Sequence, residues 1–106
     1  MTDRAAIAVR DNPAGHRFEA VVDGHTAVAT YSLSADGAII TFIHTIVPEE
    51  LRGRGIATQL VVAALGQVRE RGLQVIPECT VFQAYMRKHD AVQDLLAPEG
   101  RALLGL

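Results

Sequence analysis

The chain has 106 residues, of which 49% are hydrophobic and 21% are charged, so it can bury one modest core and is too apolar to be disordered. Ten basic residues against 12 acidic ones give a formal net charge of −2, which argues against binding nucleic acid through overall charge. There is no apolar run of the roughly 18–20 residues that a membrane span needs, no apolar leader at the N-terminus and a single cysteine, so we expect one cytoplasmic domain over residues 1–106 with no membrane partner, no intrachain disulfide and no metal site.

The first half of the chain is predicted to be an antiparallel meander. A short apolar run at residues 5–10 suggests a first strand, and a dense turn cluster follows at residues 11–15. Three longer strands are then expected, at residues 17–22, 25–33 and 38–47. The first two of these are joined by Asp23-Gly24, a dipeptide that tolerates the positive φ angles of a tight hairpin, and a second turn lies at residues 34–37.

The second half changes from a strand-like to a helical period. Apolar residues recur at helical spacing from Ile56 to Val68, and Gly72 stands where a C-terminal glycine cap belongs. A short apolar strand follows at residues 73–77. Because a strand, a helix and a strand in this order form a crossover unit, we expect this strand to pair in parallel with residues 38–47. The predicted fold class is therefore mixed α+β.

A further helix is predicted to begin at Thr80, because Thr80 and Gln83 have the spacing of a capping box. The basic residues 87–89 suit its C-terminal end, where the helix dipole favours cations. Residues 90–96 are expected to form a turn or a short helix, and residues 101–106 carry no clear signal.

The connection after the strand at residues 38–47 has the physical features of an anion site. It contains Arg52-Gly53-Arg54-Gly55 and leads directly into a helix. The first N–H groups of a helix have no partner inside it, and the helix dipole favours an anion there. The glycines allow a close backbone approach, and the arginines add positive charge. A magnesium–nucleotide site is disfavoured, because no Lys-Ser/Thr pair follows the glycines.

Residues 47–60, VPEELRGRGIATQL, resemble the acetyl-CoA signature of the GNAT superfamily of N-acyltransferases. That signature is Gln or Arg, two residues, Gly, one residue, and then Gly or Ala, and it is matched here by Arg52, Gly55 and Ala57. A second match narrows the resemblance. FIHTIVPEELRGRGIA, followed by a short strand and PECTVFQAYMRKH, looks like the small GNAT-like proteins of roughly 100 residues. The chain departs from them in having Thr80 after the cysteine and Asp90 after the helix histidine, where proline is common.

The resemblance implies acetyl-CoA as the cofactor. The pyrophosphate would rest on the amides of residues 53–58, with one of the two arginines directed to solvent or to the adenosine 3′-phosphate. In the superfamily the pantetheine arm lies where the fourth and fifth strands splay apart, which here means between residues 43–47 and 73–77. A backbone N–H near Ile46 or Val47 would then bind the thioester carbonyl. The predicted cofactor-binding residues are Ile46, Val47, Arg52, Gly53, Arg54, Gly55, Ile56, Ala57, Thr58, Lys88 and His89.

Tyr85 is the candidate proton donor to the departing thiolate. Superfamily members often use a tyrosine on the helix after the fifth strand, and Tyr85 lies about one and a half turns into that helix. The alternative is a partly buried aromatic residue with a hydrogen-bonded hydroxyl. Lys88 and His89 could contact phosphate groups or could simply complement the helix dipole.

His44 is a second candidate for catalysis. Strict alternation places it on one face of its strand with Phe42 and Ile46. If that face is the core, His44 is a structural residue; if it is the cleft, His44 could act as a general base. Glu49 and Glu50 are alternative bases, or else solvated carboxylates of the turn.

Cys79 is the third candidate. It precedes a predicted helix N-terminus, where the dipole favours the thiolate form. It would either accept the acetyl group covalently or be a small residue beside the CoA arm, and direct transfer is the common route in the superfamily.

The resemblance therefore predicts an N-acetyltransferase that moves acetyl from acetyl-CoA to an amine by direct attack in a ternary complex. The alternative is a CoA-binding module with weak or no catalysis. Larger superfamily members wall the acceptor site with helices between their first and second strands, where this chain has residues 11–15. The acceptor site should therefore be open and suited to a protein side chain or terminus, or else be completed by a partner. The oligomeric state could be a monomer or a homodimer.

Overall fold

The computed structural model describes residues 7–106, and its central feature is one sheet in which neighbouring strands follow chain order. The strands are β1 (Arg10–Asn12), β2 (Arg17–Val22), β3 (His25–Leu33), β4 (Ile39–Ile46) and β5 (Gln74–Pro77). The β1 to β4 strands are antiparallel, whereas β5 pairs with β4 in parallel. The helices are α1 (Ile56–Glu70), α2 (Thr80–Lys88) and α3 (Pro98–Leu104). The predicted α+β class, with a meander and then a parallel crossover, is confirmed.

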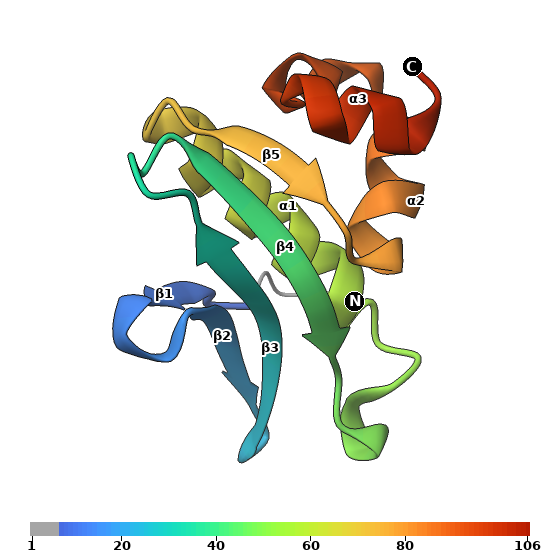
Figure 1. The fold of residues 1–106 in the computed structure, drawn as a ribbon. Coiled ribbons are helices and arrows are strands. Elements are labelled where there is room, and N and C mark those ends of the chain that lie inside the picture. The colour runs from blue at the N-terminus through green and yellow to red at the C-terminus, as the bar shows by residue number, and fades with distance from the viewer. Residues whose placement is uncertain (1–6) are drawn as a thin grey trace.

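The hydrophobic core lies on one face of the sheet. Helix α1 contacts β2, β3, β4 and β5 from this face, and α2 contacts α1, β4 and β5. Figure 1 views the sheet from the opposite side, with α1 behind it and none of the described residues forming a helix in front of it. Core side chains that meet between sheet and helices include Phe18, Tyr31, Ile40, Phe42, Val61, Val68, Phe82 and Met86. Residues 7–106 place no helix on the opposite face of the sheet, which is called the open face below.

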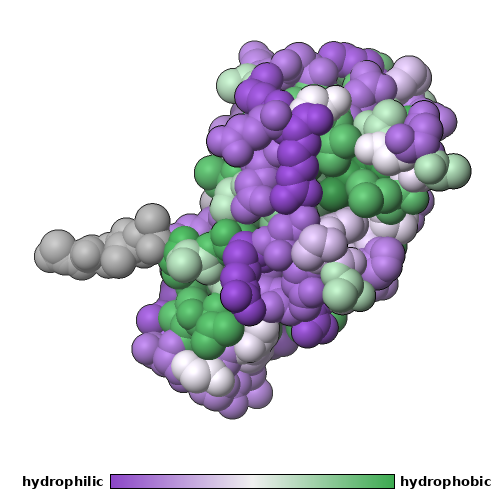
Figure 2. Space-filling model, turned by 90° about the vertical axis from the view of Figure 1, so that its left-hand side faces the viewer, coloured by the Kyte–Doolittle hydropathy of each residue, from purple (hydrophilic) through white to green (hydrophobic). Residues whose placement is uncertain are grey.

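Several large apolar side chains are not buried. Val21 is 65% exposed and Ile46 is 56% exposed, on β2 and β4. Figure 2, turned toward the left-hand side of Figure 1, shows hydrophobic side chains reaching the surface in two areas separated by hydrophilic ones. Of the helices in residues 7–106, none has the length and apolar character that crossing a bilayer requires.

The predicted first strand is wrong in position. Part of residues 5–10 lies outside the described residues, and the strand instead covers Arg10–Asn12. It shares only Arg10 with the predicted strand, and its other two residues belong to the expected turn cluster. The turn itself is compressed into a 3₁₀ turn at Pro13–Gly15, where the side chain of Asn12 accepts a hydrogen bond from the Gly15 N–H. Asn12 therefore serves both as a strand residue and as a turn cap, which a turn-forming composition alone does not reveal.

Helix α2 begins at Thr80 as predicted, but not through a capping box. Cys79 holds the N-cap position, and no side chain caps this end. Thr80 is already inside the helix, so its hydroxyl is one residue too late to cap. The side-chain amide of Gln83 instead donates a hydrogen bond to the backbone carbonyl of Glu78, at 3.5 Å.

Helix α3 was missed in the C-terminal tail. It begins with Pro98, ends at Leu104 and is capped by Gly105, which has a left-handed conformation with φ of +73°. Gly100 packs so closely on β5 that a Cβ there would lie 2.6 Å from the carbonyl oxygen of Val75. The N–H of Ala97 also donates to that oxygen, at 2.9 Å, so the tail covers the free edge of β5.

Candidate functional site

The loop between β4 and α1 is shaped by its glycines and held by Leu51. Gly53 and Gly55 have φ of +80° and +75°, a left-handed conformation that glycine adopts without strain. Leu51 is 1% exposed and joins Ile56 and Leu60 in a second hydrophobic cluster, which fixes the loop from below. The first turn of α1 is therefore presented to the solvent side of the loop with its N–H groups unpaired inside the helix.

The loop borders a small, partly open cavity of about 160 Å³. It is lined by Val47, Leu51, Arg52, Gly53, Gly55, Ile56, Ala57 and Thr58. Nearly all of the predicted phosphate-binding residues therefore come together, with the exception of Arg54. The guanidinium of Arg54 donates instead to Asp23 Oδ2 in the β2–β3 turn, at 2.8 Å.

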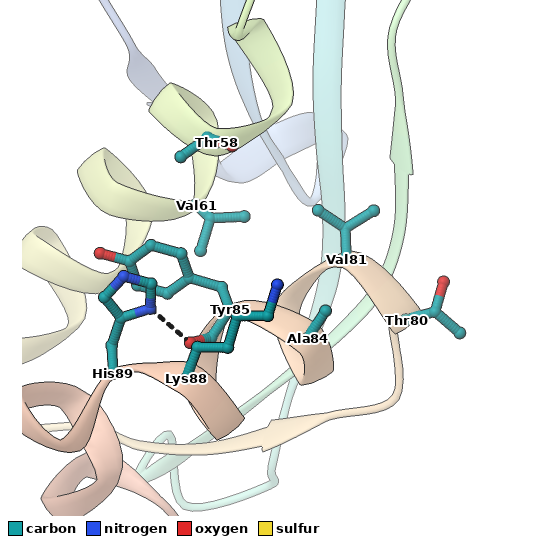
Figure 3. Close-up of a pocket in the computed structure, with 8 residues that line it drawn as sticks. All are labelled: Thr58, Val61, Thr80, Val81, Ala84, Tyr85, Lys88 and His89. Carbon is teal, nitrogen blue, oxygen red and sulfur yellow. Dashed lines mark hydrogen bonds between the residues drawn. The ribbon is translucent and has the colours of Figure 1, made fainter.

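A larger cavity of about 510 Å³ lies between α1 and α2. It is lined by Thr58, Val61, Thr80, Val81, Ala84, Tyr85, Lys88 and His89 (Figure 3). Thr58 also lines the small cavity, so the loop and the interhelical space adjoin at this residue. The two cavities together could hold an elongated ligand with an anionic end and an apolar arm.

Tyr85 and His89 form one wall of the larger cavity. Figure 3 shows the Tyr85 ring extending from α2 toward α1, with the His89 imidazole laid against it. The ring centroids are 3.9 Å apart with an interplanar angle of 13°. Nδ1–H of His89 donates to the backbone carbonyl of Tyr85 at 2.7 Å, which fixes the imidazole in this position. Tyr85, the candidate proton donor, and Lys88 and His89, two candidate cofactor-binding residues, thus line the same cavity.

The pairing between strands β4 and β5 ends at Phe42. Their pairing runs from Ile39↔Gln74 to Phe42↔Pro77, and the Phe42 carbonyl then accepts from the N–H of Cys79 at 2.9 Å. Beyond this point β4 continues without a partner on that side, as Figure 1 shows. The expected fork therefore begins at Phe42.

The directions of the backbone N–H groups distinguish Ile46 from Val47, the two residues predicted to bind the thioester carbonyl. The Tyr31 N–H donates to the His16 carbonyl, so this residue of β3 faces β2. Successive residues of an antiparallel strand point their backbone groups to opposite neighbours. Val28 and its partner Ile46 consequently face each other. Ile46 is the last residue of β4, and the same alternation continued by one residue would direct the N–H of Val47 to the free edge.

Cys79 lies at the inner end of the fork and is buried, with 4% of its surface exposed. Its thiol is 3.2 Å from the Thr45 hydroxyl, a contact in which either group can donate. The residues after it, Thr80 and Val81, line the larger cavity, whereas Cys79 does not. The thiol thus bridges β4 and α2 where the two strands separate.

The predicted face of His44 is wrong. Tyr31 pairs with Phe42 and Thr30 pairs with His44, so one step on β3 spans two steps on β4. Ile43 is the extra residue of a β-bulge, which reverses the alternation of side chains. Phe42 is fully buried in the core, while His44 is exposed on the open face, the side opposite the cavities. Ile46 shares that open face.

The two alternative bases stay in the turn. Glu49 and Glu50 belong to the 3₁₀ turn Glu49–Leu51, and both are exposed. Oε1 of Glu50 lies 3.8 Å from Nδ1 of His25 in β3. Sequence reasoning missed the role of the β2–β3 turn in approaching the loop, and no local signal marks it. It also missed Val81 and Ala84, although their spacing from Tyr85 and Lys88 places all four on one face of α2.

A glycine loop at a helix N-terminus, beside a fork between a long strand and a short parallel one, is the arrangement of the GCN5-related N-acetyltransferases. The model of that family matches residues 17–95, and the chain belongs to it. Members transfer acetyl from acetyl-CoA to an amine.

Two sets of relatives agree with this assignment. The solution structure of a GCN5-like protein from Staphylococcus aureus is similar over 89% of this chain and 91% of its own, with a TM-score of 0.65 and 26% identity. Protein NATD1 from Gallus gallus and from Homo sapiens is 40% identical over 57 residues, which is 54% of this chain. The chain spans about half the length of these curated relatives.

Proposed function

We propose that this chain is an acetyl-CoA-dependent N-acetyltransferase that uses the two adjoining cavities as its donor site. The observation that carries the proposal is that the loop cavity and the interhelical cavity adjoin, with Thr58 lining both. The pyrophosphate of the donor would sit at residues 52–58, where N–H groups and Arg52 meet it. The pantetheine arm would follow the free edge of β4 toward the fork.

The fork would place the thioester beside backbone donors. The N–H of Val47 would face the free edge of β4 and is the candidate group to bind the thioester carbonyl and the oxyanion that develops on it. The amine nitrogen attacks that carbonyl carbon, the carbon–sulfur bond breaks, and the thiolate takes a proton from the Tyr85 hydroxyl. The amine gives its proton to the imidazole of His44, which is exposed on the open face of the sheet. His44 then releases this proton to solvent, and Tyr85 takes one from solvent, so both groups return to their starting states.

This route assigns Cys79 a structural role. Its thiol is buried, with 4% of the residue exposed, and contacts the Thr45 hydroxyl of β4 at 3.2 Å. A direct attack by the amine needs no acyl-enzyme, so we propose that Cys79 holds the fork together rather than carrying the acetyl group.

Calorimetric titration with coenzyme A, acetyl-CoA and ATP tests the donor site. Gly55→Val should abolish coenzyme A binding, because valine is strained at a φ of +75° and would fill the loop. Gly37→Val is the matched control, since Gly37 has a φ of +74° in the β3–β4 turn at the far end of β4. Both variants should lose similar stability. Equal affinity for coenzyme A in the Gly55 and Gly37 variants would refute the loop assignment.

The release of free thiol from acetyl-CoA separates an enzyme from a CoA-binding module. A CoA-binding module is the alternative function. It is favoured by the open face of the sheet, where the described residues place no helix that could enclose an acceptor. A panel of small amines, lysine-bearing peptides and free peptide N-termini should show turnover with the peptides. Coenzyme A binding without turnover on any of them would favour the module.

A further inference from the structure

The tip of the β2–β3 hairpin contacts the loop between β4 and α1, although the hairpin is not part of the acetyl-CoA signature in the sequence. Arg54 Nη1 lies 2.8 Å from Asp23 Oδ2, and His25 Nδ1 lies 3.8 Å from Glu50 Oε1. Arg54 and Asp23 are 31 residues apart in the chain. The hairpin tip therefore forms part of the surroundings of the loop.

A hydrophobic cluster holds the hairpin and the loop together. Val22, next to Asp23, and Val47, at the start of the loop, both pack on the cluster that contains Leu51 and Ile56. The position of the Asp23 carboxylate relative to the loop is therefore set by buried side chains and not by the ion pair alone.

The two arginines of the loop are divided by this contact. Arg52 lines the loop cavity, whereas the Arg54 side chain is turned to the hairpin and does not line it. Of the two arginines, only Arg52 therefore lines the cavity, and the guanidinium of Arg54 is paired with the Asp23 carboxylate.

We propose that Asp23 sets the affinity of the donor site by competing with the phosphate groups of coenzyme A for Arg54. The inference rests on the proposed function. Asp23 is a positioning residue: it holds the guanidinium off the cavity in the free protein and releases it when the ligand supplies a phosphate group. The exchange is feasible because the side chains of Arg54 and Asp23 are 48% and 69% exposed, and such pairs are weak. Bidentate pairing of arginine with phosphate is stronger.

Asp23→Asn is the decisive variant. Asp23 has a φ of +50°, and asparagine adopts this conformation at least as readily as aspartate, so the turn should persist. The variant loses the charge that competes with phosphate, and coenzyme A should bind about threefold to tenfold more tightly at low salt. Glu70→Gln, which removes a carboxylate at the other end of α1, is the control and should leave the dissociation constant unchanged.

The double variant Asp23→Asn/Arg54→Ala isolates the mechanism, because the gain should vanish when Arg54 is absent. Titration with dephospho-CoA locates the contact: a gain for both ligands assigns Arg54 to the pyrophosphate, and a gain for coenzyme A alone assigns it to the 3′-phosphate. An unchanged or weaker affinity in Asp23→Asn, or a gain that survives Arg54→Ala, would overturn the proposal.

If the wild-type chain binds neither ligand, it is the proposed function that fails. The competition is then tested with sodium pyrophosphate, by following the Arg54 Nε–H signal in NMR spectra. Pyrophosphate should shift this signal at lower concentration in Asp23→Asn than in the wild type. Identical titrations would reject the competition without reference to coenzyme A.

Discussion

Phe82 anchors α2 to the strand on which the fork begins, and its removal should be among the most destabilising single changes. The rings of Phe82 and Phe42 are stacked, with centroids 4.0 Å apart and planes at 11°, and both side chains are fully buried. Truncating a buried phenylalanine to alanine costs about 3–5 kcal/mol, including the cavity left behind. A domain of this size has a total stability of about 5–15 kcal/mol. Phe82→Ala should therefore leave the protein close to its unfolding threshold.

Urea unfolding followed by far-UV circular dichroism measures this loss. The midpoint should fall with an unchanged m-value, because the surface exposed on unfolding is nearly the same. Phe82→Leu fills most of the volume and should cost about 1.5 kcal/mol, chiefly the lost aromatic contact. Val21→Ala, at a side chain 65% exposed, should stay within about 0.5 kcal/mol. A loss below about 2 kcal/mol for Phe82→Ala would show that the stacked pair does not hold α2 in place.

Three further changes test individual groups. Tyr85→Phe should lower kcat by about 10²-fold or more while coenzyme A affinity in calorimetry stays within about twofold, and a kcat near the wild-type value would exclude Tyr85 as the proton donor. Cys79→Ser should keep transfer within about threefold, and mass spectrometry after exposure to acetyl-CoA should find Cys79 unmodified; a stable acetyl adduct that an amine removes would instead make it an acyl carrier. Burial, followed by the hydrogen bond to Asp11, raises the pKa of Tyr31 from 10.0 to about 12, so the folded state favours the neutral phenol. That stabilisation is complete below pH 10 and should be lost as the pH rises toward about 12. Urea unfolding at several alkaline pH values should show this fall in the wild type and a smaller one in Tyr31→Phe.

The parts of the fold that could be predicted are those encoded locally. Asp23-Gly24 specifies a tight turn through positive φ angles, and the helical period from Ile56 ends at Gly72, as expected of α1. The first strand was misplaced because its pairing comes from contacts with β2, and three residues carry too little pattern to show it. Helix α3 was missed because its stability comes from packing Gly100 against β5, although Pro98 and Gly105 are ordinary signals for the two ends of a helix.

The candidate site divides in the same way. The loop is continuous in sequence, so residues 52–58 could be named in advance and lie around one cavity, Arg54 excepted. The partner of Arg54 is a residue of a distant hairpin, which is a tertiary contact that no local pattern encodes. The face of His44 depends on a bulge at Ile43, and one added residue reverses every side chain beyond it.

That bulge also suggests why β4 serves both sides of the sheet. Before it, Ile40 and Phe42 point into the core and the strand pairs with β5. After it, the strand loses β5, Thr45 meets the Cys79 thiol on the core side, and His44 projects from the open side. A thioester held at the fork would then be reached by the donor arm from the helical face and by an amine from the open face. The two substrates of a direct transfer could thus meet across a single strand, because the sheet is one layer thick where β4 and β5 separate.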